Sequence, residues 1–404
     1  MSKFPALFFL IMFMIGTDTF LVSPLLPTLQ AEFGVSTDSA GWMLSAYALG
    51  SAVFALIAGP LSDGWNRRVV LLCGLTAFSV CTFLCGLATD FWTMCLFRLL
   101  AGISAAFTAP QVWASIPSVL PPQRIARTMG LAFSGLAASQ AFGVPIGSWL
   151  ASGGWSVPFW TIGCASLLLA VFAYFALPSM PPMPSPSSSA GASTGLGAIL
   201  RRYVPLARSG KARAGFLAYL LIHLGSGAAF AFSGKWLAED FGLTVGEIGT
   251  AVIFLGLGNL LGSAISSSAS RKLGAARTVA AAMLGAAALY ALLPQLSPVS
   301  AATAVYFAIC TLLGIVFPLV MGALTSLNAS LRGTISSLAN ATMNGANTLG
   351  AWLAGLMFVH LGGYSAIGLF AAVCLAASLA TFLAGGLFAR ESSRAASAGR
   401  PASN

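Results

Sequence analysis

Apolar residues along the chain group into long segments that are separated by short polar stretches. Each segment reaches about 20 residues, the length that an α-helix needs to cross the hydrocarbon core of a bilayer. The pattern therefore predicts an all-α integral membrane protein. We expect twelve spans, at residues 5–30, 40–61, 69–89, 91–119, 127–150, 156–178, 214–238, 245–268, 277–297, 299–327, 334–358 and 363–388.

The composition excludes a soluble protein. Of the 404 residues, 58% are hydrophobic and only 7% are charged, whereas soluble domains carry about 25% charged residues. Asp18, Pro24 and Pro27 interrupt the first segment where a signal peptide would end in a small-residue cleavage site. We therefore expect this segment to be retained as the first helix.

Charged residues alternate between the connecting loops. Seventeen of the 19 Lys and Arg residues fall in every second loop or near the chain ends, and the other loops carry acids such as Glu32, Asp90 and Glu247. By the positive-inside rule, both termini and the central loop are cytoplasmic. The net charge of +10 thus reports topology, and no nucleic-acid partner is expected. The predicted location is the inner membrane of a bacterium.

The two halves of the chain resemble each other. Residues 29–36 (LQAEFGVS) match residues 237–244 (LAEDFGLT), and residues 153–156 (GGWS) match residues 362–365 (GGYS). Duplicated six-helix halves are typical of transporters whose substrate site lies between the halves. We predict an N-terminal half at 1–178, a cytoplasmic linker at 179–213, a C-terminal half at 214–390 and a cytoplasmic tail at 391–404.

Asp18 and Arg98 are ionisable residues inside predicted membrane spans. Such groups are costly in a bilayer and are therefore candidates for function. Asp18 lies 13 residues after Pro5, and Arg98 lies seven residues after Phe91 in a helix that runs the other way, so both lie about 10 Å from the outer edge of the core. We expect them to pair across a cavity. Protonation of Asp18 would then depend on the pair, as proton coupling requires; the alternative is a static ion pair that holds the two helices together.

Other polar side chains inside the spans are candidates for lining a substrate cavity. Asn340, Asn344 and Asn347 share one face of the eleventh helix, where substrate binding and interhelical bonding are both open. Lys235, near the end of the seventh helix, is expected to extend to the outer membrane surface. Further cavity candidates are Gln111, Gln140, Asn259 and His223.

The loop at residues 59–68 (GPLSDGWNRR) joins a helix-ending Gly-Pro to one acid and two arginines. Gly59, Asp63, Arg67 and Arg68 resemble the cytoplasmic gating loop between helices 2 and 3 of the major facilitator superfamily. Asp63 would cap a neighbouring helix or pair with an arginine. The equivalent second-half loop keeps only basic residues, so we expect the gate to be asymmetric.

Two further segments carry the same resemblance. Residues 98–102 (RLLAG) resemble the helix-4 pattern R-x-x-q-G of the superfamily's proton antiporters, with Ala in place of the usual Gln. Gly143, Pro145 and Gly147 resemble the helix-5 antiporter motif, although Ser148 stands where a second Gly is usual. The resemblance implies the twelve-helix drug or metabolite:proton antiporter branch, with Arg98 in proton coupling. Small residues on helix 5 are expected to approach the other half closely, with a bend at Pro145.

No motif for other chemistry is found in the sequence. It contains no G-x4-G-K-[ST] phosphate loop, no nucleophile triad and no metal-ligand spacing, and all seven cysteines lie in apolar segments. We expect no enzymatic activity, no cofactor and no metal.

These features together predict a proton-coupled exporter of small amphipathic compounds that works by alternating access. Its partners would be the substrate, protons and the lipid bilayer, and a monomer is expected. A specific metabolite or sugar-type carrier, including a symporter, is the first alternative. A membrane scaffold or sensor that transports nothing is the second.

Overall fold

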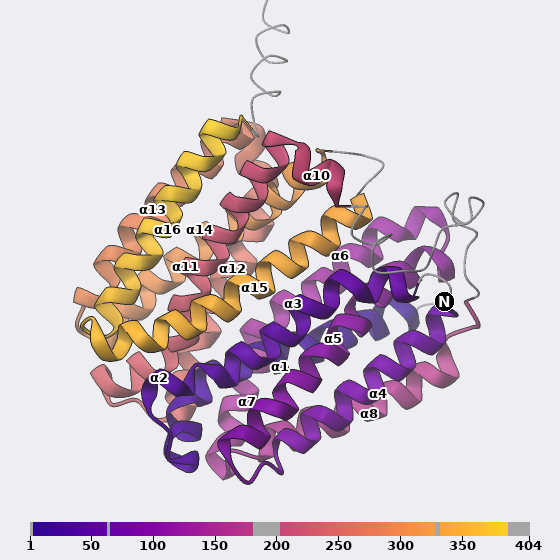
Figure 1. The fold of residues 1–404 in the computed structure, drawn as a ribbon, viewed down its shortest axis with the longest axis horizontal. Helices are drawn as coiled ribbons and strands as arrows, with labels where there is room; N and C mark the ends of the chain where they lie inside the picture. Colours follow the sequence, from indigo (N-terminus) through magenta and orange to yellow (C-terminus); the bar gives the residue numbers. More distant parts are fainter. Residues whose placement is uncertain (1–2, 63–64, 181–202, 328–331, 387–404) are drawn as a thin grey trace, which may run out of the picture.

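The computed structural model describes residues 3–62, 65–180, 203–327 and 332–386, and within these ranges the regular structure is entirely helical (Figure 1). In the N-terminal half the helices are α1 (Lys3–Phe33), α2 (Thr37–Ala40), α3 (Trp42–Ser62), α4 (Arg67–Cys85), α5 (Phe91–Val119), α6 (Pro122–Ala138), the π-helix η1 (Ser139–Gly143), α7 (Val144–Leu150), the 3-10 helix η2 (Ala151–Gly153) and α8 (Val157–Ala176).

The C-terminal half is built in the same way. After α10 (Val204–Arg208), which lies in the predicted linker, its helices are α11 (Gly210–Phe241), α12 (Val245–Leu273), α13 (Ala275–Leu292), the 3-10 helix η3 (Leu293–Gln295), α14 (Val299–Thr325), α15 (Arg332–His360) and α16 (Tyr364–Gly385).

In the described residues, twelve helical segments correspond to the twelve predicted spans. Ten described helices are long and apolar enough to cross a membrane. The other two spans are the run of α6, η1 and α7, which is interrupted by the π-helix, and α15, which carries the asparagines. The predicted all-α membrane fold is thus confirmed. The predicted tail at 391–404 lies outside the described residues, as does most of the predicted linker.

Helices pack in the same order within each half. In the N-terminal half, α1 packs against α6, α3 and α4 against α5, and α4 against α8. The C-terminal half repeats this scheme: α11 packs against α15, α12 and α13 against α14, and α13 against α16. The two bundles lie side by side in Figure 1. Six helices in each half therefore share one packing scheme, as expected for a duplicated unit.

The repeated sequence at residues 29–36 and 237–244 forms the same local structure twice. Gly34 follows α1 with φ 59°, and Gly242 follows α11 with φ 67°. This left-handed conformation is unstrained only for glycine, which ends a helix in this way. Ser36 and Thr244 then precede the next helices as extended N-cap residues. The repeat is thus a helix-ending turn that both halves use.

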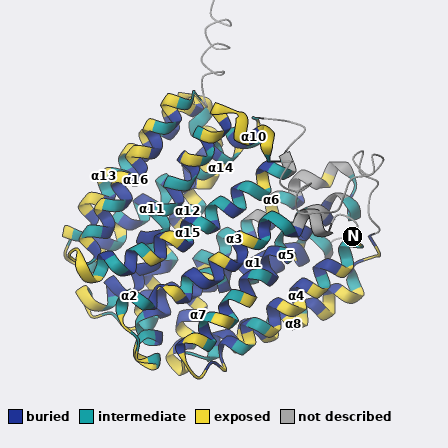
Figure 2. Ribbon diagram, viewed as in Figure 1, coloured by how far each residue is buried: buried dark blue, intermediate teal, exposed yellow. Residues whose placement is uncertain are grey.

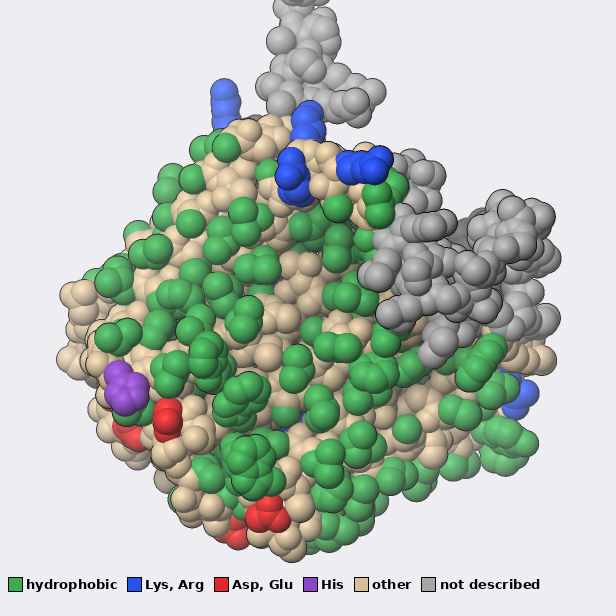
Figure 3. Space-filling model, viewed as in Figure 1, with side chains coloured by type: hydrophobic (Ala, Val, Ile, Leu, Met, Phe, Trp, Pro, Cys, Tyr) green, Lys and Arg blue, Asp and Glu red, His purple; other side chains and the backbone are tan. Residues whose placement is uncertain are grey.

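The charged residues divide the molecule into two ends. We call the end that carries Arg67, Arg208 and Arg271 the basic end, and the end that carries Glu32, Asp90 and Glu247 the acidic end. Figure 3 shows acidic and basic side chains at opposite ends of the visible face, with hydrophobic ones between. Figure 2 shows that exposed residues cover the outside of the bundle. Large apolar side chains such as Leu168 and Phe175 are among them, as expected of a surface in contact with lipid.

The two halves meet through three sets of helices: α1 with α11, α3 with α15, and η1 and α7 with α12. Nearer the basic end, the Tyr203 hydroxyl, just before α10, donates to the Leu56 carbonyl of α3 at 3.4 Å. Several hydrogen bonds between described residues of the two halves lie from the middle of the helices to the acidic end. They include Ser45 Oγ to the Thr348 carbonyl (2.8 Å) and Trp149 Nε1 to the Gly246 carbonyl (3.2 Å). In this conformation the halves are therefore joined at the acidic end.

Candidate functional site

Asp18 of α1 and Arg98 of α5 form a buried ion pair within the N-terminal half. Arg98 Nη1 donates to Asp18 Oδ2 at 2.9 Å, and neither side chain is exposed to solvent. The structure thus brings together the two residues that the sequence singled out. It does not place them on opposite sides of a cavity, because the pair is in direct contact and fully enclosed.

Two groups of α3 position the Arg98 guanidinium, and Thr19 of α1 contacts one of them. Its Nε donates to the Met43 carbonyl at 3.4 Å, and its central carbon lies 4.5 Å from the centroid of the Tyr47 ring. The Tyr47 and Thr19 hydroxyls are hydrogen-bonded to each other at 3.1 Å. A planar guanidinium stacks on an aromatic ring while donating in its own plane, which an ammonium group does not do.

Gly102 explains why α3 lies close enough to hold Arg98. A Cβ atom at Gly102 would lie 2.1 Å from the Tyr47 carbonyl oxygen, so only glycine permits this approach of α3 to α5. Gly50 makes the reciprocal contact with the Leu99 carbonyl. Arg98 therefore lies one helical turn before Gly102, and the close backbone contact at Gly102 brings the Tyr47 ring near the guanidinium. Sequence analysis identified Arg98 and missed the roles of Tyr47 and the Met43 carbonyl, because neither has a spacing signal.

Each partner of the ion pair has one polar atom that makes no hydrogen bond. Among the described residues, Asp18 Oδ1 and Arg98 Nη2 are buried and lack a partner. A carboxylate in a dry environment is stabilised by its counter-ion, so separation of the pair favours proton uptake by the acid. Among the described residues, the pair thus leaves one buried acceptor, Asp18 Oδ1, and one buried donor, Arg98 Nη2, without a hydrogen bond.

The run of α6, η1 and α7 places its irregular turn next to Pro145. Proline has no N–H, so Pro145 cannot donate to the carbonyl four residues before it. The Val144 N–H instead donates to the Ser139 carbonyl five residues before it, which makes the π-turn. π-Helical turns are rare and occur mostly as single turns within α-helices. The structure therefore places a π-turn directly before Pro145, and the bend expected at Pro145 stays a prediction.

This helix approaches the other half closely, as expected from sequence, but the motif glycines do not make the contact. A Cβ at Gly143 would meet Thr17, and one at Gly147 would meet Leu21, so both glycines pack against α1. Close approach between the halves comes from α12 instead. A Cβ at Gly256 would lie 2.3 Å from the Ala141 backbone nitrogen, and one at Gly249 would lie 2.5 Å from Ser148 Cβ. The backbone of α12 therefore rests on the π-turn and α7.

Gln140 and Asn259 join the halves near the middle of α12 and of the run of α6, η1 and α7. Asn259 Nδ2 donates to Gln140 Oε1 at 2.8 Å, from α12 to η1. Both residues are partly exposed. The two weaker cavity candidates therefore make an interhelical bond in this conformation.

The asparagines of α15 divide between two faces. Asn344 Nδ2 donates to Asn340 Oδ1 at 2.7 Å, and Asn340, Asn344 and Thr348 follow one another at four-residue intervals. Thr348 contacts Ser45 of α3, so this face is directed towards the N-terminal half. Asn347 packs instead against Gly227 of α11, in its own half. Of the predicted stripe, Asn340 and Asn344 thus lie on the face of α15 that is directed towards the N-terminal half. Asn347 contacts a helix of its own half.

His223 of α11 lies in an aromatic cluster. Its ring is stacked on Phe317 of α14 with centroids 4.9 Å apart, and it meets the Tyr219 ring edge-on at 4.5 Å. His223 Nε2 is buried and has no hydrogen-bond partner among the described residues. Gln111 of α5 is buried in the N-terminal half. The structure brings neither residue to the Asp18–Arg98 pair.

The predicted gating loop is described only in part. Asp63 lies outside the described residues, and Gly59 belongs to the last turn of α3. Arg67 Nη1 donates to Ser118 Oγ of α5 at 3.3 Å. Arg68 Nη2 donates to the Tyr174 carbonyl of α8, and its guanidinium lies 5.1 Å from the Tyr174 ring centroid. Both arginines therefore tie α4 to neighbouring helices of the same half.

Lys235 of α11 is buried, contrary to the expectation that it extends to the membrane surface. Its exposed fraction is 5%. The ammonium lies 2.6 Å from Glu239 Oε1 and donates to Gln30 Oε1 of α1 at 2.7 Å. Sequence position alone placed Lys235 near the acidic end, but it does not reveal that α1 covers the side chain.

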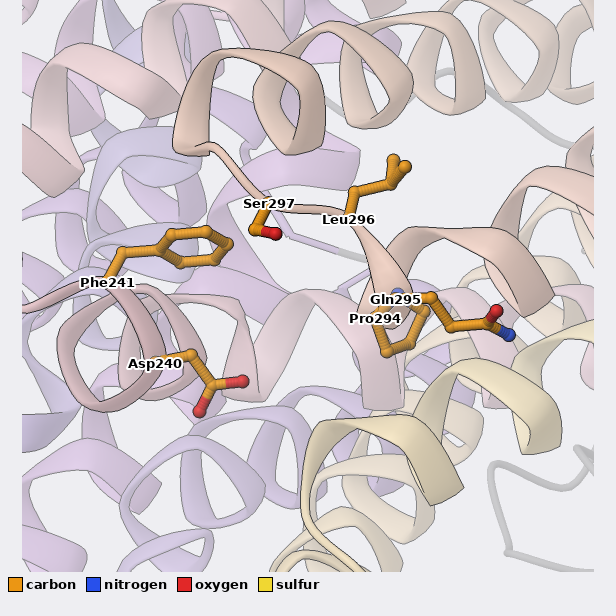
Figure 4. A pocket seen from close by; sticks show the side chains of 6 residues that line it. All are labelled: Asp240, Phe241, Pro294, Gln295, Leu296 and Ser297. Carbon is orange, nitrogen blue, oxygen red and sulfur yellow. The ribbon is translucent and has the colours of Figure 1, made fainter.

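A surface depression of about 330 Å³ lies at the acidic end of the C-terminal half. Figure 4 shows its lining at the end of α11 and around η3. No predicted site residue lines it. It lies within one half, away from the ion pair. The lining residues are Asp240, Phe241, Pro294, Gln295, Leu296 and Ser297. In the described parts of the chain, no group of three or more His, Cys, Asp or Glu side chains is arranged to hold a metal ion.

Comparison with known proteins gives concordant matches. The family model of the Major Facilitator Superfamily matches residues 8–215 and 215–403. The uncharacterized MFS-type transporter YceJ of Bacillus subtilis (strain 168) is 46% identical over 379 residues, which is 93% of this chain and 94% of that protein. Multidrug resistance protein 1 of the same organism is 27% identical over 231 residues, 56% of this chain and 57% of that protein. The inward open conformation of the xylose transporter XylE from E. coli matches with a TM-score of 0.74 at 15% identity, over 94% of this chain and 95% of that one, which shows the fold alone.

Proposed function

The chain belongs to the Major Facilitator Superfamily of membrane transporters, and from this premise we propose that it is a proton-coupled exporter of small amphipathic compounds. The observation that carries the proposal is the enclosed Asp18–Arg98 ion pair, at 2.9 Å with one free atom on each partner. A transporter that moves only a neutral substrate needs no such pair in its membrane interior. The name of one relative, a multidrug resistance protein, supports efflux and a broad substrate class.

The distribution of charge supports an orientation. Basic residues in membrane-protein loops favour the cytoplasmic side, so the basic end would face the cytoplasm and the acidic end the outside. Because the halves are joined at the acidic end, the conformation described here would be inward-facing. Exchange between this state and its outward-facing counterpart would occur by rocking of the two halves.

The coupling cycle follows from the state of the ion pair. In the inward-facing state Asp18 is paired with Arg98, as expected after proton release to the cytoplasm. In the outward-facing state, Asp18 would take up a proton from outside as substrate leaves, and the pair would separate. Return to the inward-facing state would re-form the pair and release the proton.

The energy available for this cycle is sufficient. One elementary charge that crosses a potential of 100 mV yields about 2.3 kcal/mol. A tenfold concentration ratio corresponds to about 1.4 kcal/mol, so one proton sustains a gradient of about 50-fold for a neutral substrate. Efflux against a substantial gradient therefore needs only one proton site.

The decisive variant is Asp18→Asn, which keeps the shape of the side chain and removes the titratable group. We expect it to fold, to lose at least tenfold of its pH-gradient-driven transport, and to retain exchange of labelled for unlabelled substrate. Both modes are measured in proteoliposomes with a panel of amphipathic compounds. Asp90→Asn is the matched control, because Asp90 is exposed and caps α5 outside the membrane core, where Asn also serves as a cap.

Two outcomes count against the proposal. Undiminished gradient-driven transport by Asp18→Asn would show that Asp18 takes no part in proton coupling. Equal loss of driven transport and of exchange assigns the pair to structure and not to coupling, whatever the change in stability, because removal of either partner leaves a buried charge unpaired. Saturable uptake of a single compound by the unmodified protein would instead favour a specific carrier.

A further inference from the structure

Lys235 is a buried cation that the Asp18–Arg98 mechanism does not use. It lies on α11 near the acidic end with an exposed fraction of 5%. Its ammonium contacts Glu239 Oε1 at 2.6 Å and Gln30 Oε1 at 2.7 Å, and it lies 5.7 Å from the centroid of the Phe358 ring. A lysine is rarely buried to this extent without a specific partner. We call the set of Lys235, Glu239 and Gln30 the Lys235 bridge.

The Lys235 bridge spans the boundary between the halves. Lys235 and Glu239 are one turn apart on α11, and Phe358 belongs to α15 of the same half. Gln30 is different, because it belongs to α1 of the N-terminal half. Its amide nitrogen also donates to Thr37 Oγ1 of α2 at 2.9 Å, which fixes the direction in which Oε1 points.

The geometry determines which contacts separation of the halves would break. Glu239 and Phe358 would move with Lys235, so the ammonium would keep its counter-ion and its aromatic neighbour. Of the contacts of Lys235, only the hydrogen bond to Gln30 would be lost. The ammonium would then donate to water instead, as the acidic end opens. A hydrogen bond from a charged donor to a neutral acceptor is strong enough to favour closure and weak enough to be broken in each cycle.

We infer that Lys235 is a gating residue, which holds the acidic end closed through its hydrogen bond to Gln30. Glu239, half exposed at the rim of the contact, neutralises the ammonium in both states, so that opening never leaves an unpaired charge in the membrane. The neutral amide at position 30 is then a requirement, because a carboxylate there would make an ion pair between the halves that is harder to break.

Helix α1 connects this gate to the ion pair. Asp18, Phe20, Ser23 and Gln30 all lie on α1. The Phe20 ring meets that of Phe230 edge-on at 5.5 Å, and the Ser23 hydroxyl donates to the Phe230 carbonyl of α11. The helix that carries the proton site therefore carries the N-terminal side of the gate as well. A shift of α1 on release of Asp18 would be transmitted to these contacts.

The test measures opening of the acidic end directly. Ser233 is buried at the contact, with its hydroxyl oxygen 3.5 Å from that of Ser23. In a Ser233→Cys background, a membrane-impermeant maleimide is applied to vesicles in which the acidic end faces the reagent, without substrate or gradient. Labelling of the parent protein, with its seven native cysteines, is subtracted.

We expect Gln30→Ala to raise the labelling rate about tenfold, near the lower limit of what a charge-assisted hydrogen bond contributes. Gln30→Glu should lower labelling and reduce turnover. Lys235→Gln should raise the labelling rate, whereas Lys235→Arg, which keeps the charge, should be labelled at the rate of the Ser233→Cys protein. The matched control is Gln295→Ala, an exposed amide at the same end whose hydrogen bond stays within its own half.

Labelling of Gln30→Ala at the same rate as Gln295→Ala would overturn the inference, as would faster labelling of Gln30→Glu. The Gln30 variants leave the Lys235–Glu239 pair intact, so a folding defect at Lys235 does not remove the test. The inference rests on alternating access in the proposed function and not on proton coupling. If Asp18→Asn transports normally while Gln30→Ala opens the gate, only the coupling proposal fails.

Discussion

At the scale of single residues, the ion pair shows how a charge is held in an apolar interior. Arg98 donates from Nη1 to Asp18 and from Nε to the Met43 carbonyl. The flat face of its guanidinium lies over the Tyr47 ring. Removing two charges from water costs several kcal/mol each, and close pairing with further hydrogen bonds offsets this cost. Because one atom of each partner remains without a hydrogen bond, the compensation is incomplete, which fits the separation of the pair in the proposed cycle.

This arrangement predicts strong coupling between the two residues. Arg98→Gln leaves the Asp18 carboxylate without a cation and should lower the free energy of unfolding by about 3–5 kcal/mol. Combining it with Asp18→Asn should recover at least half of that loss, since neither charge then remains buried. Denaturant unfolding of the purified protein in detergent measures all three variants. Arg277→Gln, at an exposed position, serves as control and should change stability by less than about 0.5 kcal/mol. Additive effects of the two changes would contradict a coupled pair.

Sequence reasoning recovered this site in part, for a physical reason. An acid and a base within apolar segments are visible at once, and the rise per residue of a helix gives their depth. The sequence does not give the rotation of each helix about its axis. Tyr47 was therefore one of several aromatic residues with no distinguishing position, and Lys235 was expected at the membrane surface although α1 covers it.

At the scale of elements, the contact between α12 and the interrupted fifth span determines how closely the halves approach. The motif residues Gly143 and Gly147 were recognisable from their spacing, but spacing does not show which neighbour a small residue faces. They pack on α1, whereas Gly249 and Gly256 of α12 contact α7 and the π-turn. The turn itself follows from Pro145, whose missing N–H prevents a regular ladder. An irregular helix thus lies at a contact between the halves, which the proposed rocking of the halves would remake.

Gly256→Ala tests this contact. The added Cβ would lie 2.3 Å from the Ala141 backbone nitrogen, and backbone cannot move aside as a side chain can. We expect a loss of about 1–3 kcal/mol in unfolding free energy and a shift towards the state that is open at the acidic end. Thermal unfolding and the maleimide reporter at position 233 measure the two effects. Gly345→Ala, where a Cβ meets nothing within 4 Å, should alter neither. A Gly256→Ala protein that matches this control would show that the contact is not tight.

At the scale of the whole molecule, the two halves share one packing scheme but differ in the charged residues that they bury. The N-terminal half holds the Asp18–Arg98 pair, the proposed proton site, and the Lys235 bridge, the proposed gate, lies on the boundary with the C-terminal half. The spans and the repeat were predictable because membrane thickness fixes helix length, and because the turns around Gly34 and Gly242 require the same residue. Which end is closed was not predictable, because closure depends on contacts between distant segments. The sequence assigns a gating role to Asp63, which lies outside the described residues, and that assignment stays a prediction.

Substrate-dependent proton movement is the most direct test of the central claim that export is coupled to protons through Asp18. Proteoliposomes with a trapped pH-sensitive dye are prepared without an imposed gradient, and a transported compound is added on one side. The account predicts proton flux in the direction opposite to the compound for the unmodified protein and for Asp90→Asn, and its loss in Asp18→Asn. Substrate movement without proton flux in the unmodified protein, or undiminished flux in Asp18→Asn, would contradict it.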